Sequence, residues 1–186
     1  MDGSKPMIDY VTLLLTNMSA ALIVLAWFLW RGLDRPESRN WSPAFGICGL
    51  VAAVGGFVMT FTWPIPKPFN TAYGEMSVLF GVLFLGTAWA LAAEWRLLPL
   101  GYYAFLPSPV TILLGIRIIE LSLLPASIVP GIGFILTGLC GVGAGIVLRR
   151  PDARAPRIIG ITVVLAAAGI WVQTGLLAYW LHMKPS

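Results

Sequence analysis

Long apolar runs, separated by short polar segments, make up the chain from residue 10 to residue 181. A helix that crosses a membrane requires about 20 consecutive apolar residues. Six runs approach this length, and they predict membrane spans at about 10–30, 43–63, 76–93, 101–123, 131–148 and 158–181. We therefore expect an all-α integral membrane protein in which residues 1–186 form one transmembrane domain, a six-helix bundle.

The composition supports this class and argues against others. Hydrophobic residues make up 58% of the chain and charged residues only 11%, whereas soluble domains have about 25% charged residues. The segments between the runs are too short for a soluble domain, and the first run is too long for the core of a cleaved signal peptide. The basic residues flank the spans and form no patch with aromatic readers, so we expect a lipid bilayer and no nucleic acid as the partner.

The basic residues also predict the orientation, because cytoplasmic loops of membrane proteins are enriched in Lys and Arg. The first, third and fifth loops are rich in arginine, whereas the second and fourth loops and the two chain ends have only Lys5, Lys67 and Lys184. We therefore expect the first, third and fifth loops in the cytoplasm and both termini on the extracytoplasmic, or outer, side. The arginines of these three loops are Arg31, Arg35, Arg39, Arg96, Arg149, Arg150, Arg154 and Arg157.

The fourth apolar run contains a charged pair, Arg117 and Glu120. Charge inside a membrane is costly and often marks a functional site. The two residues are three apart, so they share a helix face, and Glu75 is a candidate second partner of the arginine. When the polar residues are placed by their expected depth in the membrane, several of them fall in its outer half. We interpret this set either as a polar pocket that opens outward or as a structural network between spans; its members are Asn17, Asn70, Tyr73, Glu75, Arg117, Glu120 and Gln173.

Prolines disturb two regions of the chain. The segment TWPIPKPFNTAYGE, with Trp63, Pro64 and Pro66 at its start, predicts a stiff, extended outer loop. This loop is either an interfacial anchor or a lid or docking surface at the mouth of the bundle. Its Asn70 and Thr71 are candidate caps of the third span. In the fourth span, FLPSPV predicts a kink. If that span begins near residue 101, Arg117 lies in the outer leaflet, which we prefer; if it begins near residue 107, Arg117 lies near the midplane.

The fifth span has a face of small residues, Gly138, Gly141 and Gly145. Such faces allow close approach of two membrane helices. The partner of this face is either another span of the chain or another subunit.

Recognised catalytic and metal-binding patterns are missing from the sequence. The single histidine, His182, excludes a site with several histidines, and Cys48 and Cys140 stand alone in apolar segments. We expect no metal site and no cofactor, and the sequence argues against an enzyme that acts alone.

Several segments resemble one family over nearly the whole chain. They are FTWPIPKPFNTAYGEMSVLFGVLFL, RLLPLGYYA, GIRIIELSL and GIGFILTGLCG. In these segments the chain resembles the bacterial and archaeal membrane proteins grouped as domain of unknown function 981. The resemblance implies a small multi-span protein of a prokaryotic plasma membrane, and it assigns no activity and no catalytic residue.

Two functions follow as hypotheses from the sequence. The first is a non-catalytic accessory or structural subunit that packs against other membrane subunits or a second copy of itself, because the chain is small, its loops are short and catalytic sets are missing. The alternative is a protein that binds or transports a small molecule or ion in the outer polar pocket around Arg117. A membrane enzyme whose cofactor is shared with a partner is a third hypothesis.

Overall fold

A computed structural model describes residues 10–65, 67–121 and 128–183, and all of their regular structure is helical. Six helical stretches among the described residues are long and apolar enough to cross a membrane. The all-α class and the number of long apolar helices are therefore as predicted. The elements are α1 (Tyr10–Trp27), η1 (Phe28–Gly32), η2 (Pro36–Trp41), α2 (Ser42–Thr62), α3 (Lys67–Asn70), η3 (Thr71–Glu75), α4 (Met76–Ala92), α5 (Leu98–Phe105), α6 (Ser108–Glu120), α7 (Ile128–Arg149) and α8 (Arg154–His182).

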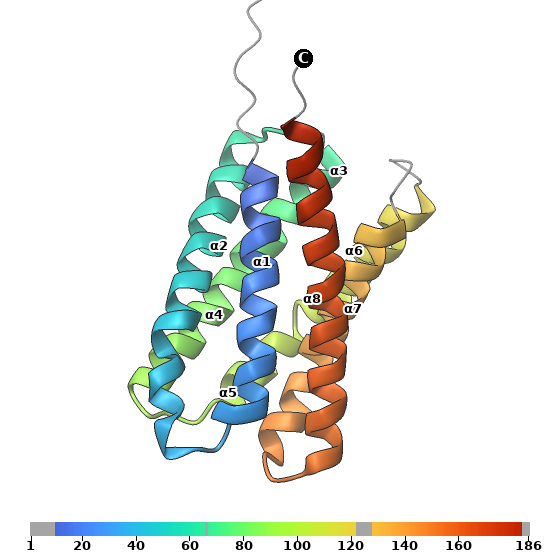
Figure 1. Cartoon of the computed structure of the whole chain (residues 1–186). Helices are drawn as coiled ribbons and strands as arrows, with labels where there is room; N and C mark the ends of the chain where they lie inside the picture. Colours follow the sequence, from blue (N-terminus) through green and yellow to red (C-terminus); the bar gives the residue numbers. More distant parts are fainter. Residues whose placement is uncertain (1–9, 66, 122–127, 184–186) are drawn as a thin grey trace, which may run out of the picture.

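The spans form a ring that is closed by contact between the first span and the last (Figure 1). Around the ring, α1 packs against α2 and α8, α2 against α4, and α7 against α8, α5 and α6. The contact between α4 and the fourth span is sparse in comparison. The α6–α7 hairpin leans away from α1 and α2 where α1 begins and α8 ends (Figure 1). We call this the termini end of the bundle. The opposite end, where the arginine-rich first, third and fifth loops lie, is the arginine end.

Glycines allow α2 and α4 to approach closely. A Cβ atom added to Gly81 would lie 2.3 Å from the backbone nitrogen of Ala53, and one added to Gly49 would lie 2.6 Å from that of Leu85. Real Cβ atoms essentially never come this close to other atoms, so the two backbones meet where no side chain intervenes.

The small face of α7 packs within the chain. Added Cβ atoms at Gly138 and Gly141 would lie 2.9 Å from the carbonyl oxygen of Ser108 and 2.8 Å from that of Ala104. Gly145 of α7 lies opposite Gly101, which belongs to α5 near the start of the fourth span. Of the two partners that the sequence left open, the structure therefore gives this face to α5 and α6.

The fourth span is broken, as its prolines predicted. It begins at Leu98, and α5 ends at Phe105 before α6 begins at Ser108. Arg117 consequently lies in the last turn of α6, about 28 Å along the span at 1.5 Å per residue. The start at Leu98 agrees with the predicted start near residue 101 and not with one near residue 107.

The segment before the third span differs from its predicted form. Residues 67–75 are helical, as α3 followed by the π-helical turn η3, and only Trp63 to Ile65 are irregular among the described residues of this loop. Asn70 does precede η3, but its side chain makes no capping hydrogen bond. The expectation of an extended loop with an asparagine cap is wrong here, because proline is compatible with the first turn of a helix.

Arg157 has a structural role that the sequence did not indicate. The guanidinium group donates through Nε to the carbonyl oxygen of Leu29 and through its terminal nitrogen to that of Trp30, the second at 3.0 Å. Both carbonyls belong to the π-helical turn η1 that ends the first span. Arg157 therefore joins the start of the last span to the end of the first.

Candidate binding cavity

A cavity of about 430 Å³ lies inside the ring and is lined by residues of all six spans. Its described lining is dominated by Leu, Phe, Val, Ala and Gly and includes no Asp, Glu, Lys, Arg or His. Both π-helical turns contribute to the lining, η1 through Phe28 and Leu29 and η3 through Ala72 and Tyr73. π-helical turns are rare and occur frequently at functional sites.

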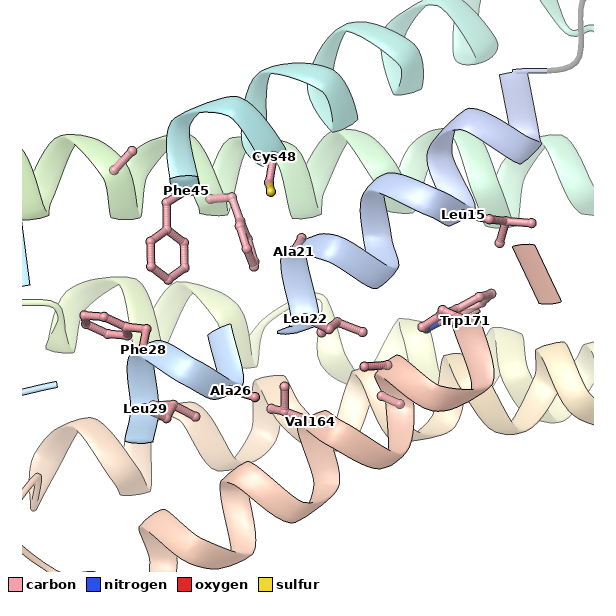
Figure 2. Close-up of a cluster of buried hydrophobic side chains, with 14 of the residues drawn as sticks. Leu15, Ala21, Leu22, Ala26, Phe28, Leu29, Phe45, Cys48, Val164 and Trp171 are labelled. Carbon is pink, nitrogen blue, oxygen red and sulfur yellow. The ribbon is translucent and has the colours of Figure 1, made fainter. Parts of the chain in front are cut away.

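Phenylalanines line the cavity toward the arginine end. The rings of Phe28 and Phe45 meet edge to face with centroids 5.3 Å apart, and Phe45 lies 5.2 Å from Phe84. Phe80 stacks on Phe84 at 4.2 Å. Figure 2 shows Phe28 and Phe45 between α1 and α2, within the buried cluster that continues through Leu22 of α1. The packing joins the first three spans.

A second aromatic group lies toward the termini end. The rings of Tyr73, Phe134 and Trp171 approach one another edge to face, with centroid separations of 5.2 to 6.3 Å. The indole Nε1 of Trp171 donates to Thr137 Oγ1 at 2.9 Å, which fixes the ring between α7 and α8. Figure 2 shows Trp171 projecting from α8 into the buried cluster. These rings join the third, fifth and sixth spans.

Most hydroxyl groups of the cavity wall are satisfied by their own helices. Thr87 donates to the carbonyl oxygen of Leu83 at 2.9 Å, and Ser108 donates to that of Ala104 at 2.6 Å. The side chains of Thr111 and Thr137 likewise bond to carbonyl oxygens one turn earlier. The hydroxyls of Tyr73 and Ser77 are different, because neither forms a hydrogen bond with any residue that the structure describes.

The cavity has open space beside α7 and reaches the surface of the bundle. An added Cβ atom at Gly143, which lines the cavity, would meet no atom within 4 Å. The lining also includes the exposed side chains of Leu139, Ile146 and Ile159. The cavity is therefore not fully enclosed by the helices.

The structure does not gather the predicted polar set into one pocket. Arg117 pairs with Glu120 at 2.8 Å, but the two side chains are 57% and 54% exposed and neither lines the cavity. Glu75 is exposed and takes part in no ion pair among the described residues, and Gln173 is exposed on α8. Of the seven residues in the set, only Tyr73 lines the cavity.

The two asparagines of the set hold neighbouring helices. Asn17 Nδ2 donates to the carbonyl oxygen of Cys48 at 2.9 Å and joins α1 to α2. Asn70 is 1% exposed, and its Nδ2 donates to the carbonyl oxygen of Met59 at 3.1 Å. Its Oδ1 is the one fully enclosed side-chain oxygen or nitrogen without a partner in the described part of the chain. Both amides fit the structural interpretation of the set better than the pocket.

The predicted outer loop contributes little to the cavity. Trp63 is 47% exposed and has a left-handed backbone conformation at φ 48°, where it ends α2. Pro64 is half-buried, and Pro66 lies outside the described residues. Neither Trp63 nor Pro64 lines the cavity.

The described ranges hold no group of three or more His, Cys, Asp and Glu side chains that could bind an ion. Cys140 lines the cavity alone, and Cys48 is buried elsewhere. The arrangement can enclose an apolar molecule and offer it two hydroxyl groups. Sequence reasoning missed Ser77, Phe134 and Trp171 because an apolar run does not reveal which face of a membrane helix is turned inward.

One comparison with known proteins finds a match. The model of a family described as "Protein of unknown function (DUF981)" matches residues 5–185. Neither a curated protein nor a solved structure matches the chain.

Proposed function

Starting from a chain that belongs to the DUF981 family, for which the match gives no activity, we propose that this protein binds an apolar, membrane-soluble molecule in its central cavity. The observation that carries the proposal is a cavity of about 430 Å³ with an apolar wall drawn from every span. Ligand sites commonly have about 300–1,000 Å³ and a mainly hydrophobic and aromatic lining with a few polar groups.

Size and polarity both support an apolar occupant. An apolar cavity of about 150 Å³ is large enough to bind benzene and stays free of water. The cavity here is nearly three times as large, and most of its polar groups are already bonded within the protein. Water would gain few hydrogen bonds there, whereas an apolar chain or ring would gain dispersion contacts with the wall.

Two glycines offer a matched test of this proposal. Added side chains at Gly143 and Gly169 would both begin in open space, but only Gly143 lines the cavity. The probe is a dodecane chain with a photoreactive diazirine at its sixth carbon, added to the protein in nanodiscs. Labelled peptides are then mapped by mass spectrometry.

We expect the probe to label lining residues near Phe84 and Trp171 in the natural protein and in Gly169→Phe. The Gly143→Phe variant should lose this labelling, because its ring occupies the open space beside α7. Labelling confined to outward-facing side chains, or unchanged cavity labelling in Gly143→Phe, would refute the proposal.

The remaining hypotheses stay proposals with narrower support. The arginine distribution supports a plasma-membrane protein with both termini outside. The role of an accessory subunit retains its support from the short loops, but the glycine face of α7 is covered by α5 and α6 and offers a partner no surface. A polar pocket around Arg117 is less well supported than the cavity, because Arg117 pairs with Glu120 at the surface of the bundle.

A further inference from the structure

We propose that the ligand of the cavity carries a neutral carbonyl group, as in a ketone, quinone or ester, and that Tyr73 and Ser77 donate hydrogen bonds to it. This inference rests on the proposed function and specifies its ligand class. The decisive feature is a pair of unbonded hydroxyl groups, one from each residue, in a wall where the other described hydroxyls are bonded.

Both hydroxyls face open space. In the described residues, Asn70 Oδ1 is the one fully enclosed side-chain polar atom that lacks a partner, so the unbonded oxygens of Tyr73 and Ser77 retain accessible surface. Ser77 is only 7% exposed as a residue, and both residues line the cavity. We therefore assign the accessible surface of these two hydroxyls to the cavity that both residues line.

The two residues are placed to act together. They are four positions apart across the junction of η3 and α4, so they belong to adjacent turns on one side of the third span. A serine inside a helix commonly bonds back to the carbonyl oxygen one turn earlier, and the other serines and threonines of the wall do so. Ser77 does not, which leaves its O–H free to donate to a ligand.

A carbonyl oxygen suits this pair because it has two lone pairs and accepts from two donors. The polar group must also be uncharged, since the described lining includes no Lys, Arg or His to balance a carboxylate. Transfer of an unpaired ionised group into an apolar site is strongly unfavourable. A neutral ketone or quinone therefore fits where a fatty acid anion does not.

The location of the hydroxyls sets the orientation of the ligand. Tyr73 belongs to the aromatic group with Phe134 and Trp171, toward the termini end, whereas Phe80 and Phe84 line the wall toward the arginine end. The carbonyl group should therefore point to the termini end, and the apolar chain should extend toward the phenylalanines.

The test uses three probes of equal chain length, namely 2-tridecanone, tridecane and tridecanoate. Binding to the full protein in nanodiscs is measured by displacement of the photoreactive dodecane probe from the cavity. The ketone also carries ¹³C at its carbonyl, so that infrared spectroscopy reports hydrogen bonding as a shift of the carbonyl stretch to lower frequency. The variants are Tyr73→Phe and Ser77→Ala, and Thr87→Val is the control because its hydroxyl lines the cavity but is already bonded to Leu83.

We expect the ketone to bind more tightly than the alkane, the carboxylate to bind most weakly, and the bound ketone to show a lowered stretch. Each of Tyr73→Phe and Ser77→Ala should weaken ketone binding about three- to tenfold, reduce the infrared shift and leave alkane binding unchanged. Thr87→Val should leave both ligands and the infrared shift unchanged.

Three outcomes would overturn the inference about the carbonyl group, and a fourth would overturn the proposed function as well. Equal binding of ketone and alkane, or a full infrared shift in the Tyr73→Phe, Ser77→Ala double variant, would remove the carbonyl site while the apolar cavity remained. Preferred binding of tridecanoate would show that the ligand is an anion and would also contradict the inference. If no probe displaced the photoreactive chain from lining residues, the proposed function itself would fail.

Discussion

The close packing of α2 and α4 makes Gly81→Ala a sensitive test of the structure. The new methyl group would lie 2.3 Å from the backbone nitrogen of Ala53 and 2.8 Å from both its Cα and the carbonyl oxygen of Gly49. All of these are backbone atoms, so no flexible side chain can move aside. The opposite case is Gly143→Ala, whose methyl group would meet nothing within 4 Å.

The two substitutions should change the free energy of unfolding in opposite directions. Restoring ordinary contact at Gly81 requires a separation of about 1 Å, and a gap of that size forfeits up to roughly half of the dispersion energy of each contact across it. Overpacking of this kind costs about 1–3 kcal/mol. At Gly143 alanine should instead stabilise the helix by about 0.5–1 kcal/mol, because glycine loses more conformational entropy on folding. The two variants should therefore differ by about 1.5–4 kcal/mol in free energy of unfolding.

The assay is reversible unfolding in mixed micelles with increasing dodecyl sulfate, followed by circular dichroism. Gly81→Ala should unfold at lower dodecyl sulfate than the natural protein, and Gly143→Ala at equal or higher dodecyl sulfate. Gly169→Ala is a second control, since its methyl group would also meet no atom within 4 Å. Equal stability of Gly81→Ala and Gly143→Ala would refute the close approach of α2 and α4 at Ala53.

Three further predictions concern polar contacts. Arg157→Met should lower the free energy of unfolding by about 1.5–3 kcal/mol in the same assay, because two carbonyl oxygens of η1 lose a charged donor. The control is Arg154→Met, which should change this free energy little because Arg154 is exposed. Thr137→Val should cost about 1–3 kcal/mol and alter the near-ultraviolet circular dichroism, since it leaves the indole N–H of Trp171 unpaired. Arg117→Ala should lower the free energy of unfolding by less than about 1 kcal/mol and leave cavity labelling intact, because its pair with Glu120 is exposed. Loss of labelling in this variant would instead support the hypothesis of a binding pocket around Arg117.

The spans were readable from sequence because each backbone polar group in a membrane must be bonded internally, which leaves helices as the form of an apolar run. The break in the fourth span was also readable, since Pro107 and Pro109 remove backbone donors. The helical form of residues 67–75 was not, because the prolines of this segment are compatible with both extended and first-turn helical backbone.

The candidate site illustrates a different limit. Depth along a span placed Arg117, Glu75 and Gln173 in one layer, but depth does not specify the direction of a side chain around its helix. The structure turns all three to the surface of the bundle and turns Tyr73 and Ser77 to the cavity. Of two residues at similar depth, one can therefore face the cavity and the other the outer surface of the bundle.

The sequence by itself determined a six-span, all-helical membrane protein, the break in its fourth span and the scarcity of recognised catalytic patterns. Tertiary structure alone decided which apolar residues face inward: Leu13 is 49% exposed, whereas Leu14 and Leu15 are each 4% exposed. The physical reason is that lipid tails are as apolar as leucine, so the hydrophobicity of large side chains does not distinguish the inner from the outer face of a membrane helix. The cavity, its aromatic ends and its two unbonded hydroxyls follow from helix rotation and packing, which an apolar run does not encode.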